Sequence, residues 1–129
     1  MAVTHSTAAR NAATDGVTAL IAASGKLKFR LSGTVSAPGT AVATLALSAT
    51  AFGASATGTA TANAITSDTN ATGNASAVAN ATLETSGAVV VIHCAVAASA
   101  SDINMTNGLV VNAGDTVTCT SLTYTALSA

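Results

Sequence analysis

The stretch GKLKFRLSG, Gly25–Gly33, decides the fold class of this chain. Apolar and basic residues alternate along it. The apolar positions are Leu27, Phe29 and Leu31, and the basic positions are Lys26, Lys28 and Arg30. A period of two places successive side chains on opposite faces of a β-strand. The stretch therefore predicts a strand with one apolar face toward a core and one basic face away from it.

The basic face concentrates most of the positive charge of the chain. Lys26, Lys28 and Arg30 are three of its four basic residues. One hypothesis is an edge strand whose charges prevent pairing with other chains. The other is a cationic strip that binds acidic patches on a neighbouring protein. We do not expect specific nucleic-acid binding, because four basic and three aromatic residues are too few to neutralise phosphates and stack bases.

The composition predicts a domain that depends on neighbours. The chain has 129 residues, which fits one domain. Charged residues make up 7% of it, against roughly 25% in an ordinary soluble domain. Alanine, threonine, serine and glycine dominate. A buried alanine removes little apolar area from water, but ordering its backbone costs about as much entropy as ordering that of a larger residue. We therefore expect a homo-oligomer, a dimer or a trimer, or docking onto a larger body.

Two segments follow from the periodicity: an N-terminal arm and helix over 1–24 and a β domain over 25–129. In the first segment, small and apolar residues recur at three- and four-residue spacing from residue 5 to residue 24. These residues are Ala9, Ala12, Ala13, Val17, Leu20 and Ile21. His5-Ser6-Thr7 offers capping side chains at the start, and Ser24-Gly25 offers a stop.

The second segment reads as a series of short strands separated by turns. Strands are expected at 26–31, 41–48, 78–83, 88–98, 108–111 and 115–125, and loops at 36–39, 67–70 and 99–105. The alternation of helix and strand that a parallel nucleotide-binding sheet requires is not visible. The expected fold is mainly β: a single antiparallel β-sandwich or jelly-roll-like domain with one short N-terminal helix.

Reactive side chains are few, and they are scattered. His93 and Cys94 are adjacent in a predicted strand, so their side chains point to opposite faces. Cys119 lies in an apolar run that would raise the pKa of its thiol. Both cysteines are expected to be free thiols. The alternative is a disulfide between them, if their strands are neighbours. We expect no enzyme activity, no cofactor and no metal site, and no run is long enough to span a membrane.

The order of these features resembles a known class of proteins. After a MAVTH-like start and an alanine-rich helix come GKLKFRLSG, ATLALSATAFG, TATANAITSDT and the final SDINM and NAGDTVTCTSLTYTAL stretches. Over nearly its whole length the chain resembles the small Ala/Thr/Ser/Gly-rich structural proteins of tailed bacteriophages. The resemblance implies a β-rich decoration or cement protein, present in many copies, that stabilises the head by bridging capsid subunits.

The implied partners are the major capsid protein and further copies of the chain, with no membrane and no specific nucleic acid. The implied location is the capsid surface of the virion, after assembly in the cytoplasm of the host bacterium. Partner contacts are then expected on the basic face and on the N-terminal segment, at Lys26, Lys28, Arg30, His5 and Arg10. The alternatives are a phage tail or fibre component, a surface-adhesion module, or a pilus-like interaction domain.

Overall fold

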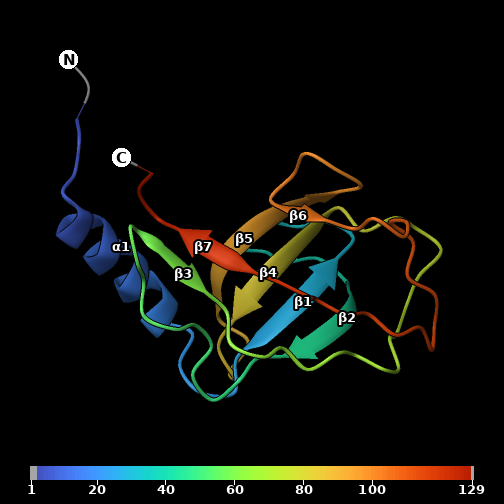
Figure 1. Ribbon diagram of the computed structural model, residues 1–129. Helices are drawn as coiled ribbons and strands as arrows, with labels where there is room; N and C mark the ends of the chain where they lie inside the picture. Colours follow the sequence, from blue (N-terminus) through green and yellow to red (C-terminus); the bar gives the residue numbers. More distant parts are fainter. Residues whose placement is uncertain (1–2, 129) are drawn as a thin grey trace.

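A computed structural model describes residues 3–128 of the chain (Figure 1). The elements in order are α1 (Thr7–Ala19), β1 (Lys26–Arg30), β2 (Ala41–Ala46), β3 (Thr59–Thr61), β4 (Asn80–Glu84), β5 (Val90–Ala97), β6 (Ile103–Asn104) and β7 (Thr123–Thr125). The prediction of a mainly β chain with one short N-terminal helix is confirmed. Residues 1, 2 and 129, at the ends of the two predicted segments, lie outside the described residues.

The strands form a five-stranded sheet and a separate two-stranded sheet. The larger sheet has the order β2-β1-β4-β5-β6 and curls strongly (Figure 1), and the smaller one pairs β3 with β7. All pairs are antiparallel except β5 with β6, which is parallel, so the sheet is mixed rather than wholly antiparallel as predicted. Because β6 has only two residues, the short turn at 98–102 suffices to bring the chain back beside β5.

The predicted apolar face of the opening stretch lies in the core. Leu27 and Phe29 are buried, and their cross-strand neighbours Leu83 and Ala81 are buried on the same face. Ala60 of β3 is part of the same core, which therefore holds the two sheets together. Phe52, which lies outside the strands, is also buried there.

The helix packs against β3 and β7 through polar residues, and of the predicted apolar stripe only Ile21, which follows the helix, is fully buried. Ser6 caps α1, since its hydroxyl accepts a hydrogen bond from the Ala9 N–H at 3.2 Å. Helix residues buried against the body are Thr14 and Thr18, whereas Leu20 is 64% exposed. α1 also ends at Ala19, short of the predicted stop.

The second half of the chain is less regular than its sequence predicted. Of the predicted strand at 115–125, only Thr123–Thr125 forms a named strand, and 108–111 makes a single bridge, between Val110 and Ala77. The predicted loop at 99–105 contains β6. Small threonine and alanine side chains give weak cross-strand packing, so local alternation alone does not build a ladder there.

Candidate functional site

The basic stretch lies in the middle of the larger sheet rather than at its edge. β1 pairs with β2 on one side and with β4 on the other. The hypothesis of a charged edge strand is therefore wrong, because both hydrogen-bonding edges of β1 are occupied within the chain. Protection of a sheet edge therefore does not explain why this internal strand carries three basic residues.

One face of the sheet, opposite the core, collects these cations with the polar residues of β4 and β5. Direct cross-strand neighbours on it are Lys26 with Glu84, Lys28 with Thr82, Arg30 with Asn80, and Thr82 with His93. We call this surface the charged face. It consists of Lys26, Lys28, Arg30, Asn80, Thr82, Glu84 and His93, with the exposed residues Thr44 and Ala95 at its sides.

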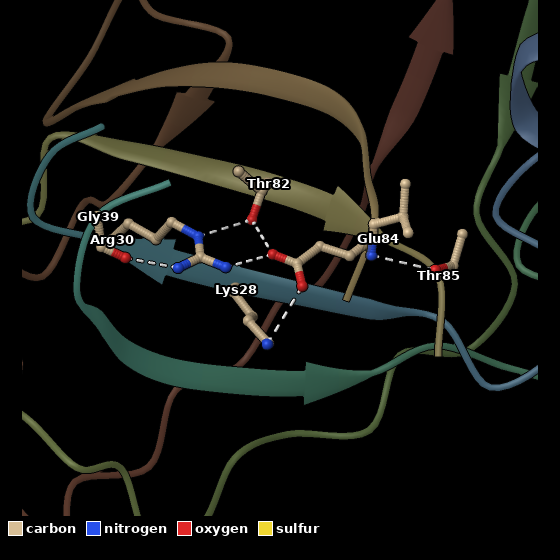
Figure 2. Close-up of polar contacts among 7 residues, drawn as sticks. Lys28, Arg30, Gly39, Thr82, Glu84 and Thr85 are labelled. Atoms are coloured by element: carbon tan, nitrogen blue, oxygen red, sulfur yellow. Dashed lines mark hydrogen bonds and ion pairs between the residues drawn. The ribbon is translucent and has the colours of Figure 1, made fainter. Parts of the chain in front are cut away.

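Glu84 is the centre of the charged face (Figure 2). Its side chain is fully buried, and its Oε1 lies 3.2 Å from the ammonium nitrogen of Lys28. The guanidinium of Arg30 and the hydroxyl of Thr82, the latter at 2.7 Å, both donate to Oε2. Both carboxylate oxygens of Glu84 are therefore engaged by groups of the same chain.

Arg30 is held by three separate partners. Besides Glu84, its Nε donates to the Thr82 hydroxyl at 3.0 Å and its Nη1 to the Gly39 carbonyl at 2.6 Å (Figure 2). Arg30 is only 8% exposed. Its side chain thus joins the hairpin loop before β2 to β4, and it is not available as the partner contact that the sequence predicted.

The environment of Glu84 keeps its carboxylate ionised. Burial alone would raise the pKa of Glu84, but hydrogen bonds from Thr82, Arg30 and Lys28 and the charge of Lys28 outweigh burial and lower it. The network therefore exists in its charged form at neutral pH.

Lys26 is the predicted contact residue that stays available. It is partly exposed, and within residues 3–128 it is the one charged side chain that makes no hydrogen bond or ion pair to its own chain. Lys28 is intermediate, because 23% of its side chain is exposed although its ammonium is paired with Glu84.

The two predicted contacts in the N-terminal segment do not lie on the charged face. Arg10 lies on α1, and its guanidinium donates to the carbonyls of Thr57 at 3.2 Å and Ser128 at 3.5 Å. It thus fastens the helix to the body. His5 precedes α1 and is exposed.

The four aspartate side chains, three in loops and Asp15 on α1, accept hydrogen bonds from backbone N–H groups. Asp68 accepts from Thr44 at 2.8 Å and Asn70 at 3.0 Å, which ties a loop to β2. The others do the same once each: Asp15 accepts from Ser55, Asp102 from Ala95 and Asp115 from Asn112. Asp68, Asp102 and Asp115 lie in loops, where an aspartate commonly bonds the backbone of its own chain.

The cysteines and His93 are not brought together as a nucleophilic set. Ile92 and Cys94 lie opposite Leu83 and Ala81 of the core face, whereas His93 faces the other way, beside Thr82. Both cysteines are free. Burial, with a smaller effect of the Asp102 charge, raises the pKa of the Cys94 thiol to about 11, and burial also raises the pKa of Cys119.

A cavity of about 520 Å³ lies between β6 with its following loop and the segment 115–122. Its wall includes Phe29, Asp102, Asp115 and Cys119. Both carboxylates already accept backbone N–H groups, and burial keeps the thiol protonated. Among the described residues, this wall therefore offers no activated nucleophile next to a free base.

Two features are absent from the part of the chain that the structure describes. No three His, Cys, Asp or Glu side chains gather there into a group that could hold a metal ion. Nor does it contain a helix with the length and apolar character needed to cross a bilayer.

Comparison of the chain with protein-family models, curated proteins and solved structures yields no match in any of the three.

Sequence reasoning missed the β4 half of the charged face. In NATLE, Asn80–Glu84, polar residues alternate with Ala81 and Leu83, which is the same period of two as in β1. The predicted strand stopped at Leu83 and so excluded the one carboxylate that neutralises the basic residues. The alternation in Asn80–Glu84 could have predicted this polar face from the sequence. The pairing of β4 with β1 could not have been predicted from it.

Proposed function

We propose that the protein is a structural component of a tailed-bacteriophage particle, a decoration or cement protein that binds the outside of the head. The resemblance of its sequence to small phage structural proteins motivates this reading. The proposed partners are the major capsid protein and neighbouring copies of the chain. The proposed location is the capsid surface.

The observation that carries the proposal is how the chain uses its few charges. Of its four basic and five acidic side chains, all but Lys26 bind a group of the chain itself. The remaining surface consists mainly of alanine, threonine, serine and glycine. Small uncharged side chains cost little desolvation and little side-chain entropy when they are buried against another protein. Such a surface suits permanent contacts in a repeated lattice.

We also propose that the architecture is a β-sandwich or jelly-roll-like domain with an irregular second layer. β3 and β7 would be its regular part. The bridges of Ala46 with Thr66, Phe52 with Ala62, and Asp68 with Val117 would extend it. A protein held by a shell can tolerate such irregular segments, because contacts with the shell add stability that the isolated chain lacks.

Stabilisation of the head would come from buried area summed over many copies. Each copy would contact adjacent capsid subunits, and separating those subunits would then require breaking the added contacts as well. A catalytic step is not needed for this role.

The test is electron microscopy of purified particles at side-chain resolution, together with protein quantification on gels. We expect density for this chain on the head and a copy number comparable to that of the major capsid protein. Density confined to the tail, with few copies, would replace the proposal with the tail or fibre alternative. Absence from particles, with binding of the isolated protein to host cells, would favour an adhesion module.

A further inference from the structure

The charged face holds more positive than negative charge. Lys26, Lys28 and Arg30 stand against a single carboxylate, that of Glu84. Arg30 and Glu84 are both buried. Because one carboxylate offsets one of the three positive charges, the charged face carries a net positive charge in the isolated chain.

The geometry explains why Lys26 is the residue left over. Lys26 is the direct cross-strand neighbour of Glu84, yet the carboxylate of Glu84 leans along β4 to reach Lys28 and Arg30. Its Oε2 accepts from Arg30 and Thr82 and its Oε1 lies beside the Lys28 ammonium, and Lys26 forms no hydrogen bond or ion pair with either oxygen. The Lys28 ammonium also has donor capacity left, because it contacts only one carboxylate oxygen.

Polar atoms nearby also lack partners. The Oδ1 of Asn80 and the Nε2 of His93 are buried without a hydrogen bond, and Asn80 is 6% exposed. Asn80 lies opposite Arg30 and His93 opposite Thr82, so both belong to the charged face. Buried polar groups in native proteins are almost always bonded. These two atoms, and the Oε1 of Glu84, which has only its ion pair with Lys28, show that the charged face is not fully hydrogen-bonded within the chain.

We propose that the charged face binds a carboxylate-bearing segment of a different protein, with an Asp or Glu side chain placed between Lys26 and Lys28. A carboxylate fits because it supplies the missing negative charge and acceptor atoms for ammonium donors. That this partner is the capsid protein rests on the proposed function. That the site binds a carboxylate rests only on the residues of the charged face.

A second copy of this chain is a poor source of the carboxylate. Asp15, Asp68, Asp102 and Asp115 each accept a backbone N–H of their own chain, and Glu84 is buried. Among the described residues, a second copy therefore offers no carboxylate that is both exposed and free of a contact with its own chain. Nucleic acid fits poorly as well, because two excess cations release few counterions.

A matched pair of variants tests the site. Thr44 and Thr61 are both exposed strand threonines, but Thr44 lies opposite Lys28 on the charged face and Thr61 lies on β3 in the other sheet. Thr44→Glu supplies a carboxylate from within the chain and should block the site. Thr61→Glu adds the same charge elsewhere.

The first measurement is an NMR titration of the isolated protein with a short peptide that contains two adjacent glutamates, and with its glutamine counterpart. We expect the glutamate peptide to shift the signals of Lys26, Lys28 and His93. The affinity should fall about ten-fold in Thr44→Glu and less than about two-fold in Thr61→Glu. Equal affinities in the two variants, equal binding of the glutamine peptide, or shifts located elsewhere would overturn the inference.

The second measurement adds the same proteins back to particles that lack the chain. If the wild type and Thr61→Glu attach and Thr44→Glu does not, the partner carboxylate lies on the particle. Attachment of all three overturns the inference and leaves the proposed function intact. Failure of the wild type to attach, with the peptide result positive, overturns the proposed function and leaves the carboxylate site intact.

Discussion

Glu84 connects three parts of the molecule that are distant in sequence. It pairs with Arg30, 54 positions earlier, and with Lys28, and Arg30 in turn binds the Gly39 carbonyl in the hairpin loop. In a buried network of this kind, removing one member leaves the others uncompensated, whereas replacing the whole network with apolar residues is often tolerated. The role of Glu84 can therefore be tested in two ways.

Glu84→Gln should lower the free energy of unfolding by about 3–5 kcal/mol, because Lys28 and Arg30 would stay half-buried or buried without a counter-charge. Urea unfolding followed by circular dichroism measures this. The control is the triple variant Lys28→Met, Arg30→Met, Glu84→Leu, which should be destabilised less than Glu84→Gln. A single variant as stable as the wild type would contradict this account.

The stability should also depend on pH through Glu84. Its folded pKa lies below the ordinary value of 4.5. Its ionised form therefore stabilises the folded state at every pH above 4.5, and this contribution is lost as the pH falls through the lower folded value. As the pH falls from about 7 to about 3, the difference in unfolding free energy between wild type and Glu84→Gln should shrink, by at most about 2 kcal/mol because the loss begins only below 4.5. A difference that stays constant over this range would assign the effect to packing rather than charge.

At the scale of elements, α1 is attached by hydrogen bonds more than by apolar area. The buried Thr14 hydroxyl donates to the Gly58 carbonyl at 2.6 Å and accepts from the Ala126 N–H at 3.1 Å. Asn11 accepts from the Gly58 N–H at 2.7 Å. The helix is thereby joined to the turn before β3 and to the chain after β7.

Thr14→Val keeps the shape of the side chain but leaves two backbone groups without partners, so it should cost about 2–3 kcal/mol. Thr18→Val is the matched control. The Thr18 hydroxyl bonds only the Asp15 carbonyl of its own helix, so its loss should cost less than about 1 kcal/mol. Thermal unfolding of both variants measures this, and equal losses would contradict the assigned role of Thr14.

Prediction from sequence succeeded where one element's pattern was sufficient. The alternation of Leu27 and Phe29 predicted the core face of β1, and Ser6 predicted the helix cap. It failed for the buried face of α1. Thr14 and Thr18 are buried because the elements that cover them offer backbone groups to bond, which no helical periodicity of apolar residues reveals.

At the scale of the whole molecule, nearly all charged side chains bind groups of their own chain, and the rest of the surface is nearly uncharged. A single domain has a small reserve of stability, and binding of the folded form to a partner adds to it. The proposed function therefore has a thermodynamic consequence.

Attached to particles, the chain should unfold at a higher temperature than in isolation, because the contacts with the shell bind only the folded form. Differential scanning calorimetry of purified particles and of the isolated protein measures both transitions. A shift of several degrees is expected for a domain of this size. Identical transitions would mean that the particle contributes no stabilising contact, which contradicts a cement role.

The sequence by itself determined that the chain is mainly β, that Leu27 and Phe29 face a core, and that Lys26, Lys28 and Arg30 share the opposite face. These properties follow from side-chain periodicity, which is local. Only the tertiary structure decided that β1 lies between β2 and β4, that Glu84 neutralises Lys28 and Arg30, and that Lys26 is left without a partner. The order of strands depends on pairings between residues far apart in the chain, and a local pattern cannot specify them.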